Sequence, residues 1–312
     1  MTGNGIAARF FVACIKASPE GVICRSGMGD DFSDSALVLL GHGSTLNVDS
    51  ASPTYQHTDA LRDRNIFAQV EEAFWKLEPC VSAVLRGVFA RRVFVVPLFI
   101  SKGYFTEEVL PRELGFAQRE DGSFETIRNE NGQTIHYCGP ISTHDSMTGA
   151  LIARAKGIVE AHPFPSLPRA ENTTLFIAGH GASNNENSRK AIEDQADRIR
   201  ANGEYAGVHA VFMEEEPRVE ACYELAETKN IVMVPFFISD GLHSFEDIPV
   251  MLGETEKRVR ERMANGQPTW VNPTERRAKR LWYSASIGTE PFIAEVILER
   301  VREAAGGDQT IW

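Results

Sequence analysis

The sequence predicts an α/β protein built from two tandem units, each a mainly parallel sheet flanked by helices, related by pseudo-twofold symmetry. Two observations carry this prediction: a long segment occurs twice, and short apolar runs alternate with amphipathic segments within each copy. Alternating strands and helices form parallel sheets with right-handed crossovers. Each copy is therefore expected to fold as an open sheet covered by helices.

The repeat is visible at one constant spacing. ALVLLGHGST matches TLFIAGHGAS, and PLFISKGYFTEEVLP matches PFFISDGLHSFEDIP. His42 then falls on His180 and Pro97 on Pro235, in both cases 138 positions apart. This spacing holds over more than seventy positions without a gap, which chance rarely produces. Further on, Tyr137 matches Tyr283 at a spacing of 146, so the second copy carries about eight extra residues.

Each element of the second copy follows from its local pattern. Apolar runs ended by glycine or proline indicate strands, and apolar residues three or four apart, such as Ile192, Ala196 and Ile199, indicate helices. The continuous apolar run at 230–238 is typical of a parallel strand covered on both faces. Strands are expected at 174–179, 207–213, 230–238 and 280–288, and helices at 187–201, 217–228, 244–264 and 291–304.

The first copy and the connections add three expectations. The Asp-Gly and Asn-Gly pairs within 120–137 predict a hairpin. Three prolines within residues 161–172 mark a linker between the two copies. Met28 resembles a natural start, so residues 1–27 are expected to be an extension with little structure. The predicted organisation is an extension at 1–34, a first domain at 35–160, a linker at 161–172 and a second domain at 173–312.

Composition narrows the functional classes. The net charge of −11 argues against a general nucleic-acid binder, which needs a basic surface. No apolar run reaches the roughly 18 residues of a membrane span. The five cysteines form no CxxC pair, which favours free thiols in a reducing cytosol over a cluster or structural zinc. We therefore expect a cytoplasmic protein with neither a nucleic-acid nor a membrane partner.

Three polar groups follow three strands of the second copy. His180 follows the first strand, Glu214 to Glu216 follow the second, and His243 follows the third. Because ligands bind at the carboxyl ends of parallel strands, these side chains are expected to meet at one edge. Two imidazoles and a carboxylate suit a divalent ion such as Co²⁺, Ni²⁺, Fe²⁺ or Zn²⁺, and they also suit proton transfer.

A structural explanation exists for each feature separately. The Gly-His-Gly sequence can be a simple turn, Ser244 can cap a helix, and the three glutamates can be a solvated charge run. Their coincidence at corresponding strand ends favours function. The remaining histidines, which are surface or core residues in this interpretation, are His57, His136, His144, His162 and His209.

These motifs resemble the CbiX-type sirohydrochlorin chelatases, the ATP-independent class of tetrapyrrole metal chelatases. The resemblance rests on Ala178–Ser183, Phe212–Pro217 and Val234–Pro249 and extends over 35–304. It implies two flavodoxin-like or chelatase-like domains enclosing a cleft in which a polycarboxylate macrocycle receives Co²⁺, Fe²⁺ or Ni²⁺. The metal is then a substrate, and no permanently bound cofactor is implied. The absence of a GxxxxGK[ST] loop agrees with an ATP-independent reaction.

Carried over by position, His180 and His243 match the metal-binding and proton-accepting histidines of the family. Glu214 best matches the acidic residue, with Glu215 left open as an alternative. In the first copy Phe105 stands at the position of His243 and Lys76 at that of Glu214, which predicts a degenerate first site. Residues expected to hold the carboxylates of the substrate are Ser183, Asn184, Asn185, Arg189, Ser44 and Lys102.

The sequence leaves several points open. The physiological metal and the tetrapyrrole are not fixed, so the insertion step could serve cobalamin or sirohaem biosynthesis, or act on another porphyrin. A non-catalytic metal or tetrapyrrole carrier would use the same histidines. The internal duplication removes the need for a second copy to complete the cleft, and we therefore expect a monomer.

Overall fold

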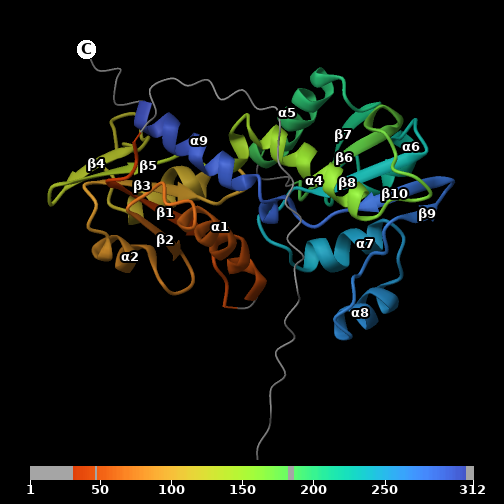
Figure 1. The fold of residues 1–312 in the computed structure, drawn as a ribbon, viewed down its shortest axis with the longest axis horizontal. Helices are drawn as coiled ribbons and strands as arrows, with labels where there is room; N and C mark the ends of the chain where they lie inside the picture. The colour runs from red at the N-terminus through yellow and green to blue at the C-terminus, as the bar shows by residue number, and fades with distance from the viewer. Residues whose placement is uncertain (1–30, 46–47, 182–185, 307–312) are drawn as a thin grey trace, which may run out of the picture. The chain divides into compact units, whose positions relative to one another are not determined.

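The computed structural model describes residues 31–45, 48–181 and 186–306 (Figure 1). These residues contain two five-stranded sheets with strand orders β2-β1-β3-β5-β4 and β7-β6-β8-β10-β9. The first four strands of each order are parallel, and the last pairs antiparallel. Two mostly parallel, helix-flanked sheets were expected from the repeat, and that prediction is confirmed.

The elements follow the alternation that the sequence predicts. The first repeat contains β1 (Ser35–Gly41), α1 (Ser52–Arg62), β2 (Gln69–Phe74), α2 (Val81–Gly87), β3 (Arg92–Pro97), α3 (Leu110–Glu113), β4 (Ile127–Glu130), β5 (Gln133–Tyr137) and α4 (Met147–Ala161). The second contains β6 (Thr173–Gly179), α5 (Glu186–Asn202), β7 (Gly207–Phe212), α6 (Cys222–Leu225), β8 (Asn230–Pro235), α7 (Ile248–Met251), α8 (Glu256–Ala264), β9 (Thr274–Arg276), β10 (Lys279–Tyr283) and α9 (Ile293–Gly306).

Both sheets end in a hairpin. The predicted one joins β4 to β5 through Asn131 and Gly132, which have φ angles of 52° and 79°. The second, between β9 and β10, was not predicted. Its turn residues, Arg277 and Ala278, adopt φ angles of 48° and 59° without the glycine or asparagine that normally signals such a turn.

Two predicted helices of the second repeat are shorter than the sequence pattern indicates. The helix expected at 217–228 is reduced to a short turn and α6, because Arg218 is extended, with φ −68° and ψ 156°. The helix expected at 244–264 is interrupted near Gly253, whose φ of 101° ends α7 before α8 begins. The strand expected at 230–238 ends at Pro235, which frees the next three residues for the site described below.

The closing helices cross between the repeats. Arg154 of α4 donates to Thr289 Oγ1 in the second repeat at 2.9 Å. Its counterpart 146 positions later, Arg300 of α9, donates to Thr143 Oγ1 in the first repeat at 2.7 Å. Helix α4 contacts β8 and helix α9 contacts β3, so each sheet is covered by a helix from the other repeat (Figure 1). The domain boundaries predicted along the chain stay a prediction, because side-chain packing continues across them.

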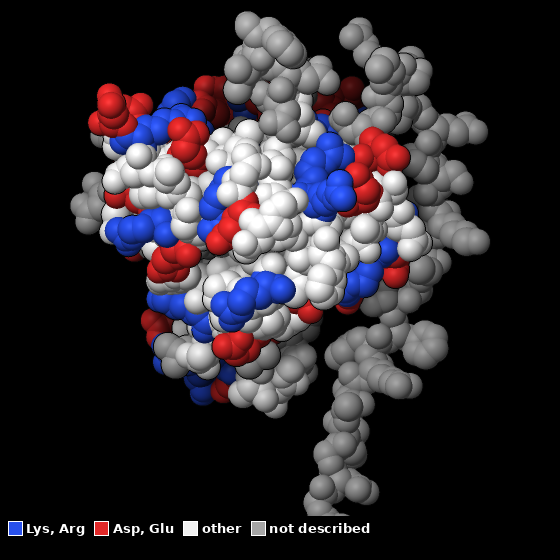
Figure 2. All heavy atoms as spheres, turned by 90° about the vertical axis from the view of Figure 1, so that its left-hand side faces the viewer, with Lys and Arg blue, Asp and Glu red and all other residues white. Residues whose placement is uncertain are grey.

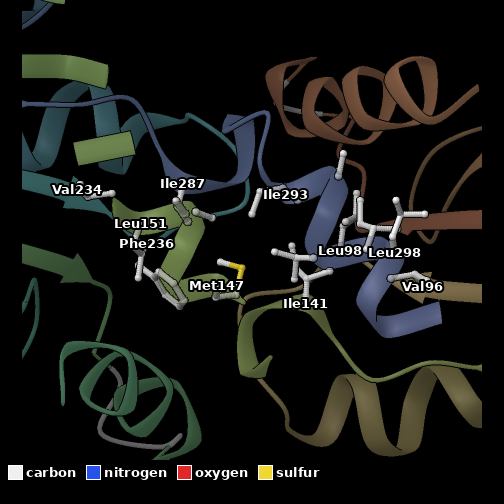
Figure 3. Close-up of a cluster of buried hydrophobic side chains, with 14 of the residues drawn as sticks. Val96, Leu98, Ile141, Met147, Leu151, Val234, Phe236, Ile287, Ile293 and Leu298 are labelled. Carbon is white, nitrogen blue, oxygen red and sulfur yellow. The ribbon is translucent and has the colours of Figure 1, made fainter. Parts of the chain in front are cut away.

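A single apolar cluster joins the two sheets through these helices. Val96 and Leu98 from the first repeat lie in the same cluster as Leu298 of α9, and Val234 and Phe236 lie in the same cluster as Leu151 and Met147 of α4 (Figure 3). All of these side chains are at most 3% exposed. The two repeats therefore share this cluster, while each also has a separate apolar cluster of its own.

One buried polar contact at this junction predicts a pH-dependent stability. The His57 ring donates from Nε2 to the Gly288 carbonyl across the repeats at 2.7 Å. Burial lowers the pKa of His57 from its ordinary value of 6.5, against the effect of that hydrogen bond. The folded protein thus holds a neutral ring that the unfolded chain protonates below pH 6.5, so stability is lost as the pH falls.

The variant that isolates this effect is His57→Gln, because Gln195 occupies the matching position of the second repeat and donates to the His144 carbonyl. Between pH 7.5 and 5.5 the wild type should lose up to about 1.4 kcal/mol more unfolding free energy than the variant. Urea unfolding at both pH values measures the difference. Equal losses in the two proteins would contradict the assignment.

Charged side chains are mixed on the face of the first repeat shown in Figure 2, where Lys and Arg lie among Asp and Glu around an uncharged central area. Pairs such as Arg62–Glu72 and Arg119–Glu125 balance the positive charge. Separately, none of the helices in the described residues is both long enough and apolar enough to span a bilayer.

Candidate active site

The Gly-His-Gly turn after β6 needs both of its glycines. A Cβ on Gly179 would lie 1.9 Å from Ile192 of α5, so the helix packs on the bare backbone. Gly181 has a φ of 64°, and a Cβ there would meet Glu215 at 2.8 Å. Between them, His180 is held with its Nδ1 3.0 Å from the Gly181 carbonyl. The turn therefore fixes the direction in which the imidazole points.

Glu214 lies beside His180 because the backbone hydrogen bonding between β6 and β7 continues past the ends of both strands. The Glu214 amide donates to the His180 carbonyl at 3.2 Å, and a Glu214 carboxylate oxygen lies 3.5 Å from His180 Nδ1. Glu215, the alternative left open by the sequence, turns toward Arg189 instead, at 3.1 Å. The structure thus brings Glu214, and not Glu215, to the His180 ring.

His243 reaches the same place from the neighbouring strand. After β8 the chain runs into a π-helical turn, η6 (His243–Asp247), and the His243 and His180 rings meet edge to face with centroids 4.9 Å apart. His243 Nδ1 lies 2.7 Å from an Asp247 carboxylate oxygen, one turn further on. The sequence prediction that the two imidazoles converge at adjacent strand ends is borne out by this geometry.

The contact at Nδ1 determines the tautomer of each ring. A carbonyl or a carboxylate oxygen accepts, so Nδ1 of His180 and Nδ1 of His243 carry the hydrogens of these bonds. In the tautomer with its hydrogen on Nδ1, the ring offers the lone pair of Nε2 to a metal, which is the arrangement of metal-binding histidines oriented by a second group. Over the described residues, no three His, Cys, Asp or Glu side chains form a ready-made metal cluster. The pair of imidazoles is therefore the core of the candidate site, with Glu214 on its Nδ1 side.

A cleft of about 720 Å³ opens in front of His243. Its walls come from both repeats and include His42 with Phe99 on one side and Phe237 with Leu242 on the other. The segments that build the two walls are the repeated apolar stretches after β3 and β8. Among the described wall residues there is no Lys or Arg, and the walls are mainly apolar. The cleft thus offers a bulky ligand mainly apolar contact.

The matching position of the first repeat is filled by aromatic rings. His42 lies 5.3 Å from Trp75 and 5.8 Å from Phe105, measured between ring centroids. The Lys76 amide donates to the His42 carbonyl, as Glu214 does to His180, but the Lys76 ammonium lies over Trp75. One imidazole is present and its partner imidazole and carboxylate are replaced. That the first site is degenerate stays a prediction.

The residues predicted to hold substrate carboxylates fall into three groups. Ser183, Asn184 and Asn185 lie outside the described residues. Arg189 bonds to Glu193 and Glu215, so its charge is already paired. Ser44 is not among the described wall residues of the cleft, and Lys102 lines a different pocket, with Thr106 and Tyr137. The structure does not bring this set together around the cleft.

Asp247 is a site residue that the sequence prediction missed, although its spacing of four from His243 was a usable signal. Asp247→Ala removes the acceptor that holds Nδ1, so the ring can rotate or change tautomer. We expect Co²⁺ affinity to fall about 10–100-fold, the usual cost of losing such a partner. Calorimetric titration with Co²⁺ measures this effect, and Asp194→Ala, which breaks only the exposed Lys190 pair on α5, is the control. Unchanged affinity in Asp247→Ala would contradict the orienting role.

Comparison with known proteins agrees with this arrangement. A family model described as CbiX matches residues 36–158 and 174–304. A protein of Halobacterium salinarum named "Probable sirohydrochlorin cobaltochelatase" is 43% identical over 279 residues, covering 86% of this chain and 91% of that one.

Solved structures show the same architecture. A multi-domain protein from Deinococcus radiodurans, described as structurally similar to chelatases, has a TM-score of 0.68 and 30% identity, covering 89% of this chain and 56% of that one. The sirohydrochlorin chelatase SirB from Bacillus subtilis in complex with cobalt has a TM-score of 0.54 and 17% identity, covering 88% and 97%. The family model matches each repeat once, and the chain therefore belongs to the CbiX family.

Proposed function

We propose that this protein inserts a divalent metal, Co²⁺ or Fe²⁺, into sirohydrochlorin without ATP, as a sirohydrochlorin chelatase. Family membership and the name of the Halobacterium salinarum relative support the reaction and the substrate. The observation that carries the proposal in this molecule is the His180–His243 pair, 4.9 Å between ring centroids, of which His243 lines a cleft of about 720 Å³.

The two halves of the cleft have different tasks in this proposal. The macrocycle lies with its apolar faces between the walls that carry Phe99 and Phe237, and its carboxylates point toward the open edge. His180 and His243 bind the incoming ion through Nε2, and the metal is a substrate that leaves in the product. The second repeat, 173–312, supplies the metal-binding groups, and the first, 35–160, supplies the opposite wall.

Insertion releases two protons, because the free macrocycle carries two N–H groups where the product carries one metal ion. An imidazole accepts a proton at neutral pH once it has handed over the ion. Glu214, 3.5 Å from His180 Nδ1, stabilises the resulting imidazolium and passes the proton toward solvent. His180, His243 and Glu214 are thus the proposed catalytic residues. Glu214 acts here as a proton acceptor. To serve as a third metal ligand, its carboxylate would have to move from Nδ1 of His180 toward the Nε2 side, where the ion binds.

The decisive experiment mixes purified protein with sirohydrochlorin and Co²⁺, Fe²⁺ or Ni²⁺ in turn, without ATP, and follows the absorbance of the macrocycle. We expect Co²⁺ or Fe²⁺ to convert the spectrum at a rate proportional to enzyme concentration. Tight binding of both ligands without conversion would identify a carrier instead. Faster conversion of a porphyrin with fewer carboxylates would identify a different substrate.

We further propose that the protein works in the cytoplasm as a monomer. The described cysteines, Cys80, Cys138 and Cys222, are all free, which fits a reducing compartment. Both walls of the cleft come from one chain, so a second copy is not needed to complete it. Light scattering should give one chain per particle, and a dimer that loses activity on dilution would overturn the monomer.

A further inference from the structure

The loop that carries His243, residues 237–243, is held from behind by the chain segment at 283–288, which we name the strap. The Tyr283 hydroxyl donates to the Ser244 carbonyl at 2.8 Å. The Gly288 amide donates to the Phe237 carbonyl at 2.9 Å. A Cβ on Gly288 would lie 1.9 Å from the Ile238 carbonyl oxygen, so strap and loop are in direct backbone contact.

Two further bonds join loop and strap through one residue, Ser286. Its amide donates to an Asp240 carboxylate oxygen at 2.8 Å, and its hydroxyl lies 2.7 Å from the Ser244 hydroxyl. Ser286 is 0% and Ser244 2% exposed, so water does not replace these bonds when they are lost. A buried amide left without a partner also lacks the hydrogen bond that water would give it, so its loss destabilises this loop. Asp240 and Ser286 thus fix the loop on both sides of His243.

The first repeat lacks this pair of bonds, although it keeps the tyrosine contact. The Tyr137 hydroxyl still donates to the Thr106 carbonyl at 2.8 Å, as Tyr283 does to Ser244. Ser286, however, is matched 146 positions earlier by Pro140, which has neither an amide hydrogen nor a hydroxyl. Asp240 is matched 138 positions earlier by Lys102, which cannot accept a hydrogen bond.

The backbone of the two straps is the same at this position. Ser286 has φ −58° and ψ 149°, and Pro140 has φ −63° and ψ 148°. At this position the backbone suits either residue, so the residue type decides whether the two bonds can form. The repeat that has His243 has the two bonds, and the repeat in which phenylalanine replaces that histidine has lost them.

We propose that Asp240 and Ser286 are positioning residues of the metal site, which hold the His243 loop so that its imidazole meets that of His180. The inference rests on the proposed metal-binding role of the two histidines. In this proposal Asp240 acts by accepting a hydrogen bond from Ser286, and its negative charge is not needed. Arg154 is a nearby cation. Burial lowers its pKa, while the charges of Glu290 and Asp240 act to raise it. The competing explanation is therefore that Asp240 acts only through its charge on Arg154.

Four variants of the full-length protein separate these explanations. Asp240→Ala removes the acceptor, and Ser286→Pro copies the first repeat at a φ that proline adopts without strain. Asp240→Asn keeps an acceptor oxygen and removes the charge. Pro140→Ala changes the matching strap position of the first repeat and is the control. Circular dichroism and the thermal midpoint verify folding, and Ser286→Ala, which removes only the hydroxyl, replaces Ser286→Pro if the latter does not fold.

The readout is Co²⁺ affinity by calorimetry in the absence of tetrapyrrole. Asp240→Ala and Ser286→Pro should bind Co²⁺ about 10–100-fold more weakly than the wild type, the range for residues that orient a metal ligand. Asp240→Asn and Pro140→Ala should stay within about twofold. Wild-type affinity in Asp240→Ala and Ser286→Pro, or equal losses in Asp240→Asn and Asp240→Ala, would overturn the inference.

Turnover is measured separately, so the two proposals fail separately. If the wild type binds Co²⁺ but does not convert sirohydrochlorin, the chelatase proposal fails while the affinities still decide the positioning role. If the wild type converts sirohydrochlorin and the strap variants lose neither affinity nor kcat, the chelatase proposal stands and the positioning role is wrong.

Discussion

Replacing His243 with alanine should lower metal insertion into sirohydrochlorin by about 10²–10⁴-fold, the range for loss of a positioned proton-transfer group. The variant also removes one of two imidazoles that bind the ion, so Co²⁺ affinity should fall with the rate. Among the described residues, no third His, Cys, Asp or Glu forms a preformed metal cluster with this pair. Initial rates from the macrocycle absorbance, with saturating Co²⁺ and sirohydrochlorin, measure the loss.

The matched control is His42→Ala, which changes the corresponding histidine of the first repeat. Its ring lies among Trp75, Phe99 and Phe105, and no imidazole of the described residues stacks on it. Loss of this wall residue should affect KM more than kcat and should reduce the rate by less than about tenfold. Equal losses in the two variants would show that both repeats bind metal, contrary to the one-site proposal.

The second large effect concerns stability. Leu298 of α9 is 3% exposed in the cluster that also contains Val96 and Leu98 of the first repeat (Figure 3). Leu298→Ala should therefore destabilise the protein by about 2–5 kcal/mol, as in other buried leucine truncations. Urea unfolding measures the loss, and Leu225→Ala, at a position that is 37% exposed, should cost much less.

The same experiment tests the exchange of helices. Because the shared core joins both sheets, circular dichroism and tryptophan fluorescence should give coincident transitions in the wild type and in Leu298→Ala. The opposite result is a Leu298→Ala protein whose circular dichroism and fluorescence transitions separate, with about half of the unfolding amplitude at the wild-type urea concentration. It would show that the repeats unfold independently and that α9 contributes little to the first sheet.

Much of this arrangement was predictable from the sequence because the repeat itself carries the information. The constant spacing placed the strands in register, and the rule that ligands lie at the carboxyl ends of parallel strands brought His180, His243 and Glu214 to one edge. The hairpin between β4 and β5 followed from its Asn-Gly pair. These features depend on local sequence and on topology, which a sequence alone can reveal.

What the sequence did not reveal depends on contacts between distant segments. The exchange of α4 and α9 leaves the order of elements unchanged, so the alternation of strands and helices contains no trace of it. Arg189 was predicted to bind substrate because basic residues near a strand end often do, but its neighbours Glu193 and Glu215 neutralise it. Lys102 follows the first-repeat wall segment of the cleft in the sequence, but it lines a separate pocket in space.

The most direct test of the central claim is a crystal structure of the protein with Co²⁺. We predict one ion per chain bound to Nε2 of both His180 and His243 at about 2.1 Å, the usual length of an imidazole–metal bond, with Nδ1 of His243 still bonded to Asp247. An ion bound at His42, or bound by only one of the two histidines of the second repeat, would contradict the account.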